Sequence, residues 1–459
     1  MELAPSTSTR STTSSSDPHV VILGAGFAGL NAAKQLADAP VSVTLVDRNN
    51  YHKFQPLLYE VAMAGLEPND IAHNARHLMQ DYDNVEFRLG TVREVQPTAQ
   101  QVLLQNGDSI AYDYLLIATG AVTDYFGVDG ASEHAFPLKN IPDAVNLRNH
   151  VLRQFERYSR APNEVPLGTL NFVIVGGGPT GVETAGAFAE LFEALDRDYP
   201  TVDVPAQARA VLIELQPDLL PPYDDDLQTY TREVLEERGV EVMTETIVEQ
   251  VTPDAVVLAD GRRLSTQTLI WAAGVQASPI VDSLGVEQTQ GGRVVVDEDL
   301  SVPAYPNIYT VGDAAAVRAP DGAIHPQLAQ VAIQTGSHAA RNIRRSVADT
   351  PTTAFDYRDY GKMATIGRNA AVAELTGGIK FKGFFAWILW VFIHIAKLVG
   401  FRNRLTTFVN WIYNYFTYDR SARLILDMVP IDDDIPMEVE EVNREVKSHI
   451  DALKASARQ

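Results

Sequence analysis

The sequence predicts an α/β fold made of two similar domains with parallel sheets, followed by a helical C-terminal region. The prediction rests on two glycine-rich turns, GAGFAG at residues 24–29 and GGGPTG at residues 176–181. Each turn follows an apolar run typical of a buried strand and precedes an alanine-rich stretch typical of a helix. A strand, a G-x-G-x-x-G turn and a helix in this order form a Rossmann-like unit, so we expect the chain to bind two dinucleotides.

An acidic residue follows the second predicted strand of each unit. Asp47 ends the apolar run 41–46, and Glu214 ends the run 210–213. A carboxylate at this place can accept hydrogen bonds from ribose hydroxyl groups. Glu214 would also repel a 2'-phosphate, which favours NADH over NADPH in the second unit. The alternative is that both acids are ordinary strand-end carboxylates.

Later in each unit, a predicted strand ends in a small, polar turn. Residues 114–120 end in Ala-Thr-Gly, and residues 268–274 end in Ala-Ala-Gly, so the chain contains an internal repeat. A third segment, residues 307–315, combines an apolar strand with Gly312 and Asp313 and is expected to return to the first unit. The alternative for Gly312 and Asp313 is a surface turn.

Composition excludes several classes of protein. The chain has 459 residues, enough for two or three domains, and 46% of them are hydrophobic. It has no cysteine, so disulfides, thiolate metal sites and cysteine-based redox chemistry are excluded. The net charge of -22 makes nucleic acid an unfavourable partner. The histidines form no H-E-x-x-H or similar cluster, and we expect no metal site.

The order of these motifs resembles the two-dinucleotide-binding-domain flavoproteins, in which an NADH domain is inserted into an FAD domain. Further segments resemble type II NADH:quinone oxidoreductases, which are single-subunit and do not pump protons. They are residues 50–62, 272–279, 329–334, 363–368 and 400–405. The resemblance covers residues 19–427; Lys53 and Lys362 depart from it, and residues 428–459 match nothing.

The resemblance implies a domain organisation with five segments. Residues 1–18, rich in Ser and Thr, form a disordered tail. Residues 19–130 and 291–360 form the FAD-binding domain, residues 131–290 the inserted NADH-binding domain, and residues 361–459 a C-terminal membrane-anchoring and dimerisation region.

The resemblance also implies non-covalent FAD as cofactor, NADH as substrate and a membrane quinone as acceptor. Asp313 would then bind the ribityl chain of the flavin. The implied FAD residues are Gly24, Gly26, Phe27, Ala28, Gly29, Asp47, Arg48, Val92, Thr119, Gly120, Gly312, Asp313, Ala329 and Gln330. The implied NADH residues are Gly176, Gly178, Pro179, Thr180, Gly181, Glu183, Glu214, Ala273 and Gly274.

Gln330 and Gln334 are the candidate quinone residues. Their i, i+4 spacing puts them on one face of a helix. The resemblance implies that Ala329 and Gln330 pack against the flavin ring and that both glutamines line the quinone pocket. The alternative is that both amides face water.

Glu183 is the candidate catalytic acid. It lies two residues after Gly181, in the first turn of a predicted helix, where the helix dipole stabilises a carboxylate. The resemblance implies that a carboxylate here faces the nicotinamide and the flavin and supports nucleotide binding or proton delivery to quinone. The alternative is a purely stabilising residue at a helix start.

Residues 378–424 are expected to bind anionic lipid from the cytoplasmic side of the cell membrane, as a peripheral protein. They contain seven Lys or Arg, one acid and three Trp. The apolar run 384–398 is too short to span a bilayer, and residues 401–416 carry an apolar stripe at helical spacing. The alternative is a buried helical hairpin or a dimer interface. A second stripe at residues 439–453 favours packing or a homodimer.

Two other functions remain open at this point. A flavoprotein reductase with a protein acceptor, such as a ferredoxin, would not need residues 384–418. A membrane-bound nucleotide sensor would keep the glycine turns but show no turnover. Sulfide:quinone oxidoreductases use cysteines at the flavin, and the absence of cysteine excludes them.

Overall fold

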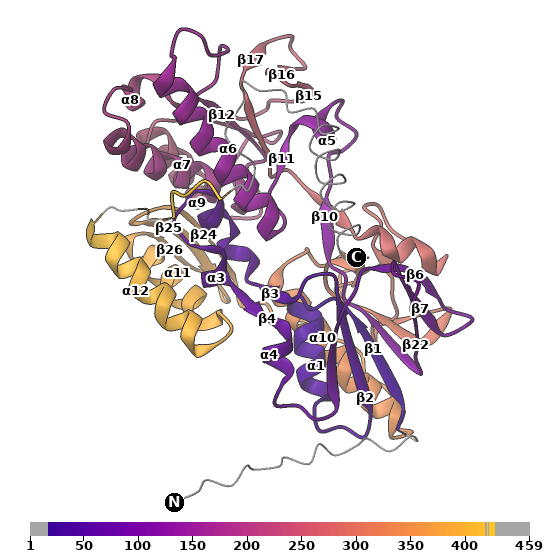
Figure 1. Cartoon of the computed structure of the whole chain (residues 1–459). Helices are drawn as coiled ribbons and strands as arrows, with labels where there is room; N and C mark the ends of the chain where they lie inside the picture. The colour runs from indigo at the N-terminus through magenta and orange to yellow at the C-terminus, as the bar shows by residue number, and fades with distance from the viewer. Residues whose placement is uncertain (1–16, 418–419, 421, 427–459) are drawn as a thin grey trace, which may run out of the picture. The chain divides into compact units, whose positions relative to one another are not determined.

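The structure, a computed structural model, describes residues 17–417, 420 and 422–426. Its first domain is built on a six-stranded sheet (Figure 1). Neighbouring strands are parallel except β21 and β22, which are antiparallel. In sheet order they are β21 (Ser301–Val302), β22 (Tyr305–Thr310), β9 (Tyr114–Ile117), β1 (His19–Leu23), β2 (Ser42–Asp47) and β5 (Val85–Leu89).

Both faces of this sheet are covered. Val20 and Ile22 of β1 pack with helices α1 (Phe27–Leu36) and α10 (Ala329–Val347), which cross in contact with each other. Val21 and Leu23, which point the other way, pack with the antiparallel strands β6 (Val92–Gln96), β7 (Gln101–Leu104) and β8 (Ser109–Ala111). A strand buried on both faces explains the continuous apolar run before the first glycine turn.

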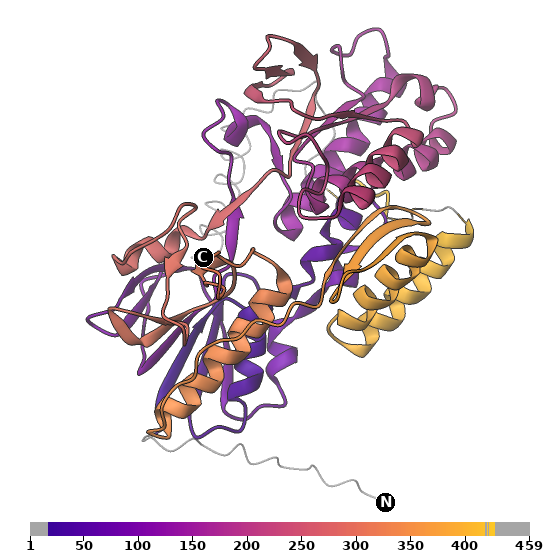
Figure 2. The ribbon, with the colours of Figure 1, turned by 180° about the vertical axis from the view of Figure 1, so that it is seen from behind.

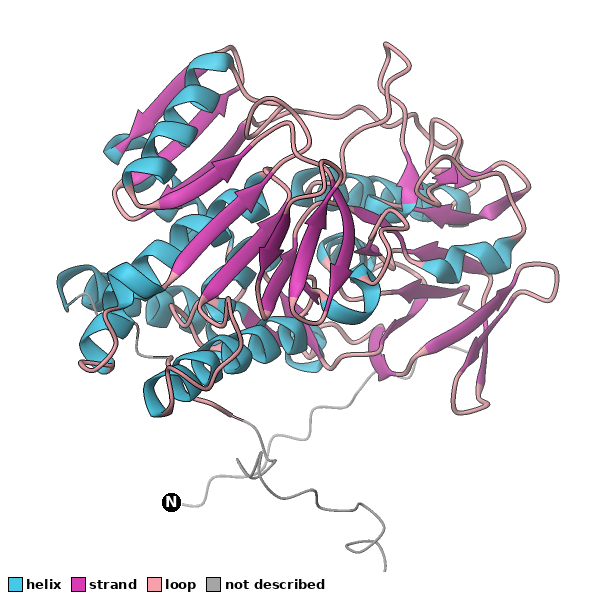
Figure 3. Cartoon of the chain, turned by 90° about the horizontal axis from the view of Figure 1, so that it is seen from above, coloured by secondary structure: helices cyan, strands magenta, loops and turns pink. Residues whose placement is uncertain are grey.

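The second domain repeats this plan with a five-stranded parallel sheet. Its strands, in sheet order, are β11 (Phe136–Pro137), β18 (Thr268–Trp271), β12 (Asn171–Val175), β13 (Arg209–Ile213) and β14 (Val240–Met243). The order β18-β12-β13-β14 matches β9-β1-β2-β5 of the first domain, which confirms the predicted α/β fold with two Rossmann-like units. Figure 3 shows strands flanked by helices. The long helices here are α6 (Ile141–Arg160), α7 (Pro179–Asp198) and α9 (Asp225–Glu237), and the antiparallel strands are β15 (Val248–Thr252), β16 (Ala255–Leu258) and β17 (Arg263–Ser265).

Two antiparallel strands carry the chain between the domains. β10 (Ala121–Thr123) leaves the first domain and pairs with β19 (Val275–Ala277), on which the chain returns. Ala277, Val281 and Leu284 already pack in the core of the first domain, the last two from the 3-10 helix η2 (Pro279–Leu284). The chain therefore rejoins the first core before residue 290, where we expected the inserted domain to end.

The C-terminal region starts with an antiparallel sheet and ends with two helices. The sheet contains β24 (Lys362–Gly367), β25 (Ala370–Leu375) and β26 (Ile379–Gly383), and the helices are α11 (Phe384–Lys397) and α12 (Phe401–Thr417). α11 packs on β25, β26 and α12, and Figures 1 and 2 show α11 and α12 side by side. Within the described residues, none of the helices has the length and apolar character needed to cross a bilayer.

Short elements complete the described chain. They are β3 (Tyr51–Lys53), η1 (Gln55–Leu57), α2 (Leu58–Ala62), α3 (Pro68–Ile71), β4 (Ala72–Asn74), α4 (Ala75–Met79), α5 (Ala131–His134), α8 (Val204–Gln207), β20 (Val294–Val295), η3 (Gly312–Ala314) and β23 (Ala315–Ala316). Residues 1–16 of the predicted tail at residues 1–18 lie outside the described residues, as does the stripe at residues 439–453.

Candidate functional site

The first glycine turn needs glycine for two different reasons. Gly24 has a φ of +102°, and a Cβ there would lie 2.4 Å from the carbonyl oxygen of Ala118; a Cβ on Gly29 would lie 1.8 Å from that of Gly24. Gly26 has an ordinary φ of -73° and nothing within 4 Å of a Cβ. The protein itself therefore excludes side chains at Gly24 and Gly29, whereas at Gly26 the open space fits a pyrophosphate at the start of α1.

Asp47 fixes this turn. Its carboxylate accepts the backbone N–H of Ala25 and that of Asn49, both at 2.7 Å. Two backbone amides hold the two oxygens at the carboxyl end of β2, and each oxygen keeps a lone pair for a ribose hydroxyl group. This arrangement fits the ribose-binding role expected for Asp47.

The second turn has the same geometry. Gly176 has a φ of +111°, and a Cβ on it would lie 2.6 Å from the Cα of Ala273. A Cβ on Gly181 would lie 1.8 Å from the carbonyl oxygen of Gly176. Gly178, with a φ of -71°, faces open space. Glu214 accepts the backbone N–H of Gly177 and that of Gln216, which repeats the contacts of Asp47. The two units therefore share the glycine geometry and the carboxylate contacts expected of a dinucleotide-binding turn.

The other NADH residues expected from the sequence lie around this second turn. Pro179 and Thr180 open α7, and Thr184 donates its hydroxyl to the carbonyl of Thr180. Gly274 packs against the exposed ring of Phe126, and a Cβ on Gly274 would lie only 2.3 Å from this ring.

The segment around Asp313 lies at the carboxyl end of β22 in the first sheet. Gly312 has a φ of +63° and donates its N–H to the hydroxyl of Thr335 on α10. The Asp313 carboxylate lies 3.7 Å from the ammonium of Lys139. The buried hydroxyl of Thr119 has no hydrogen-bond partner among the described residues. A polar atom left unpaired beside the expected flavin residues fits a polar ligand such as the FAD ribityl chain.

The remaining FAD residues expected from the sequence lie on three elements. Phe27 and Ala28 open α1, and a Cβ on Gly336 of α10 would lie 2.3 Å from the carbonyl of Ala28. This close approach of α10 brings Ala329 and Gln330, at its start, to the same domain as the first turn. Arg48, directly after β2, is exposed, and Val92, at the start of β6, is half-buried.

Gln330 and Gln334 bind backbone rather than each other. Gln330 donates to the carbonyl of Gly361 at 3.1 Å and accepts the N–H of Tyr360 at 3.2 Å. Gln334 donates to the carbonyl of Arg358 at 2.8 Å and accepts its N–H at 3.0 Å. Both amides therefore hold the segment 358–361, which leads into β24, alongside α10.

Glu183 is buried between α7 and β24. Its side chain accepts the backbone N–H of Thr365 at 3.4 Å, and the residue is 8% exposed. Burial raises the pKa of this carboxyl well above 4.5, the backbone N–H of Thr365 lowers it, and the negative charge of Glu60 raises it. The environment of Glu183 therefore favours the protonated form of its carboxyl.

A cavity of about 330 Å³ is lined by Thr365, whose N–H binds Glu183, whereas Glu183 itself does not line it. Six of its lining residues are aromatic, and two polar atoms of these, the hydroxyl of Tyr59 and the indole N–H of Trp390, are buried without a hydrogen-bond partner among the described residues. The lining residues are Tyr59, Glu60, Gly65, Ala187, Glu190, Glu193, Thr365, Gly367, Arg368, Phe384, Trp387, Ile388, Trp390, Val391, Phe408, Trp411, Ile412 and Arg420. Gln330 and Gln334 do not line this cavity.

One end of the cavity carries a buried ion cluster that the sequence analysis missed. Arg420 lies 2.7 Å from the Glu190 carboxylate and 3.6 Å from that of Glu60, and it donates to the carbonyl of Met63 at 2.7 Å. Burial raises the pKa of Glu60, as does Glu190, whereas Arg420 lowers it. These residues are far apart in the sequence, and no motif joins them. No group of side chains in the described part of the chain could hold a metal ion.

The chain matches two family models. Residues 18–336 match the pyridine nucleotide-disulphide oxidoreductase model, and residues 360–418 match the NDH2 C-terminal domain. A type II NADH:quinone oxidoreductase of Mycobacterium tuberculosis, Ndh, is 38% identical over 424 residues, which cover 89% of this chain and 90% of the relative. The type II NADH:quinone oxidoreductase of Staphylococcus aureus is 31% identical over 366 residues, or 78% of this chain and 90% of the relative.

A solved structure has the same fold. NDH2 from Plasmodium falciparum in complex with NADH superposes with a TM-score of 0.80 at 22% identity, covering 90% of this chain and 100% of that chain.

Proposed function

The chain belongs to the type II NADH:quinone oxidoreductases, and from this premise we propose which of its residues bind NADH, hold FAD and admit the quinone. The protein is an FAD enzyme that oxidises NADH and transfers two electrons to a quinone. FAD, when bound, supplies the hydride acceptor for NADH and the two-electron donor for the quinone. The residues of the chain bind and orient NADH, FAD and the quinone, and they supply protons to the quinone.

Each glycine turn binds a different nucleotide. The open space at Gly26, next to the carboxylate of Asp47, supports FAD binding in the first domain, with Asp313 on the ribityl chain. The open space at Gly178, next to Glu214, supports NADH binding in the second. Glu214 has no partner of opposite charge in the described residues and repels a 2'-phosphate.

Glu183 is the proposed proton donor to the quinone. Quinone reduction consumes two protons along with two electrons, and burial, which raises the pKa of the Glu183 carboxyl, favours the protonated form that can supply one. Glu60, a second buried carboxyl with a raised pKa, is close enough to influence Glu183.

The aromatic cavity is the proposed passage for the quinone. An apolar wall suits an isoprenoid tail, and the unpaired polar atoms of Tyr59 and Trp390 suit the quinone oxygens. Thr365, which lines the cavity, binds Glu183 through its N–H. Gln330 and Gln334 then serve the quinone site by holding the segment before β24, rather than as free amides.

The protein binds the membrane as a peripheral protein, and we place this contact on α11. Phe385 and Phe392 are 76% and 70% exposed, and Lys397 at the end of the same helix is also exposed. Exposed aromatic residues beside basic ones are typical of an interfacial anchor on anionic lipid. The location on the cytoplasmic side of the cell membrane stays a prediction. A homodimer stays a prediction.

A single assay tests the function. Purified, FAD-loaded protein is mixed with NADH and a soluble quinone analogue, and the NADH absorbance band is followed. We expect rapid oxidation of NADH, slow oxidation of NADPH and no need for a protein acceptor. Oxidation that requires an added ferredoxin would support a reductase with a protein acceptor instead, and binding without turnover would support a nucleotide sensor.

A further inference from the structure

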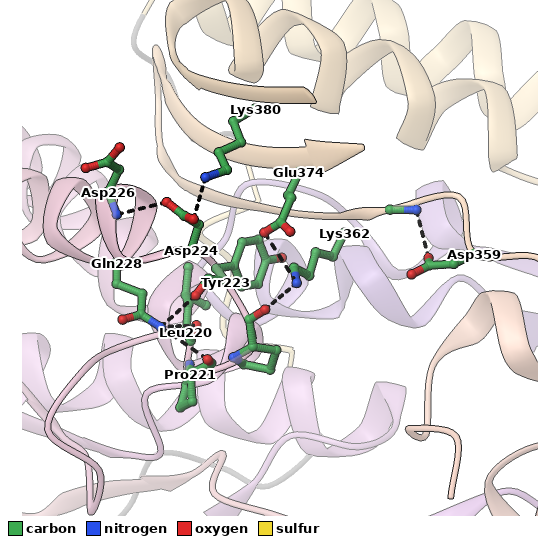
Figure 4. A network of polar contacts seen from close by, with 12 residues as sticks. Leu220, Pro221, Tyr223, Asp224, Asp226, Gln228, Asp359, Lys362, Glu374 and Lys380 are labelled. Carbon is green, nitrogen blue, oxygen red and sulfur yellow. Dashed lines mark hydrogen bonds and ion pairs between the residues drawn. The ribbon is translucent and has the colours of Figure 1, made fainter. Parts of the chain in front are cut away.

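The loop between β13 and α9 joins the NADH turn to the C-terminal sheet. On one side, Leu220 donates its N–H to the carbonyl of Gly177 at 2.8 Å, and a Cβ on Gly177 would lie 2.7 Å from the side chain of Leu219. On the other side, the loop meets two lysines of the C-terminal sheet (Figure 4). The loop therefore lies between the backbone that binds NADH and the sheet that leads into α11.

The two lysines belong to a row of alternating charges across the sheet. Lys362 of β24 is paired in register with Glu374 of β25, and Glu374 with Lys380 of β26. The ammonium of Lys362 lies 3.3 Å from the Glu374 carboxylate. The three residues of this row lie on three neighbouring strands, and the lysines at its two ends contact the loop.

Each lysine holds a different point of the loop. Lys362 donates to the carbonyl of Pro222 and lies over the ring of Tyr223, with its ammonium 5.3 Å from the ring centre. Lys380 forms an ion pair with Asp224, which caps α9 by accepting the N–H of Asp226 at 3.3 Å. Tyr223 between them is buried, so the loop is fixed by packing as well as by charge.

We propose that Lys362 and Lys380 are positioning residues for NADH, which hold the loop 219–224 against Gly177 and so fix the backbone N–H that Glu214 accepts. This inference rests on the proposed function of the second turn as the NADH site. It also accounts for Lys362, which departs from the pattern of the family: its ammonium binds the loop and Glu374 and does not line the aromatic cavity.

The two lysines should contribute unequally. The Lys380–Asp224 pair is more than one-third exposed on both sides, and such pairs contribute little and weaken in salt. Lys362 is 33% exposed and makes three contacts, with a carbonyl, a carboxylate and an aromatic ring. Replacement of Lys362 should therefore have the larger effect on NADH binding.

The test compares Lys362→Met and Lys380→Met with Lys382→Met in the FAD-loaded enzyme. Lys382 lies on the same strand as Lys380, but its ammonium lies over Tyr230 of α9, not over the loop. We expect Lys362→Met to raise the KM for NADH roughly three- to tenfold, while kcat and the KM for quinone change less than about twofold. Lys380→Met should raise the KM for NADH less, and Lys382→Met should leave it unchanged. Lys362→Arg should keep most of the affinity that Lys362→Met loses.

Calorimetric titration of the oxidised enzyme with NAD+ gives a readout that needs no turnover. The Kd for NAD+ should rise in parallel with the KM for NADH, and Glu374→Gln, which removes the partner of Lys362, should reproduce part of the rise. Equal affinity in Lys362→Met and wild type, or the same loss in Lys382→Met, would overturn the inference. If wild type binds NAD+ but does not reduce quinone, the proposed function fails and the titration still decides the role of Lys362.

Discussion

The backbone N–H of Thr365 donates to the buried carboxyl of Glu183, which lies 182 residues earlier in the chain. This contact joins α7 of the NADH domain to β24 of the C-terminal region. The two elements can approach because Gly186, one helical turn after Glu183, has no side chain: a Cβ there would lie 2.3 Å from the carbonyl of Ile366. The carboxyl is thereby shielded from water and kept beside the aromatic cavity.

Glu183→Gln should slow quinone reduction. The glutamine keeps an oxygen for the N–H of Thr365 but has no proton to donate, so we expect kcat with a quinone analogue to fall about 100-fold. The affinity for NAD+ should change little. Asp196→Asn, on the exposed side of the same helix and outside the cavity wall, is the matched control. Full activity of Glu183→Gln in steady-state assays would remove Glu183 from proton transfer.

The same substitution predicts a change in stability with pH. The pKa of Glu183 is higher in the folded protein than its ordinary value of 4.5, so the folded state binds more protons between these two values. Wild type should therefore lose stability as pH rises above about 4.5, whereas the glutamine has no proton to lose. In thermal unfolding from pH 4 to pH 8, the melting temperature of Glu183→Gln should rise relative to that of wild type as the pH increases. A constant difference would contradict the raised pKa.

Gly26→Ala and Gly178→Ala should separate the two nucleotides. Neither Cβ meets protein atoms and both backbones have ordinary φ values, so both variants should fold. We expect Gly26→Ala to be purified with little flavin absorbance, and Gly178→Ala to keep its flavin but bind NAD+ at least about tenfold more weakly. Gly29→Ala, where a Cβ meets backbone at 1.8 Å, should instead lose both the fold and FAD. Normal flavin content in Gly26→Ala would show that the pyrophosphate lies elsewhere.

Glu214→Gln should relax the selection between NADH and NADPH. The amide can still accept one of the two backbone N–H groups, but it no longer repels a 2'-phosphate. The ratio of kcat/KM for NADPH to that for NADH should rise about tenfold in steady-state assays. Glu241→Gln, on the neighbouring strand β14 and paired with Arg209, removes the same charge away from the turn and should leave the ratio unchanged.

The double variant Phe385→Ser and Phe392→Ser should weaken membrane binding without affecting chemistry. Each exposed ring contributes about 2 kcal/mol when it is buried in the apolar part of a bilayer. We expect the variant to lose flotation with vesicles of anionic lipid and to keep its activity with a soluble quinone analogue. Leu167→Ser, which removes an 82% exposed apolar side chain from the NADH domain, is the control. Unchanged flotation of the double variant would exclude this face of α11.

Much of the nucleotide-binding architecture could be predicted because its signals are local. The turns at residues 24–29 and 176–181, with their flanking strands and helices, lie within short segments of the chain. Asp47 and Glu214 could be expected at the ends of the next strands, and both accept a backbone N–H from their turn. The boundary expected at residue 290 stays a prediction. The sequence alone does not reveal that Ala277, Val281 and Leu284 pack in the first core, because an apolar stretch fits either of the two cores.

The sequence by itself determined the two nucleotide-binding units, the absence of cysteine chemistry and the basic, aromatic character of the C-terminal region, since glycine, charge and periodicity act over a few residues. Only the tertiary structure decided that Arg420 meets Glu60 and Glu190, that Lys362 holds the loop beside the NADH turn, and that the amides of Gln330 and Gln334 bind backbone. Those contacts join residues that are many positions apart. Burial and packing, which no local pattern encodes, set their distances and the raised pKa of Glu183.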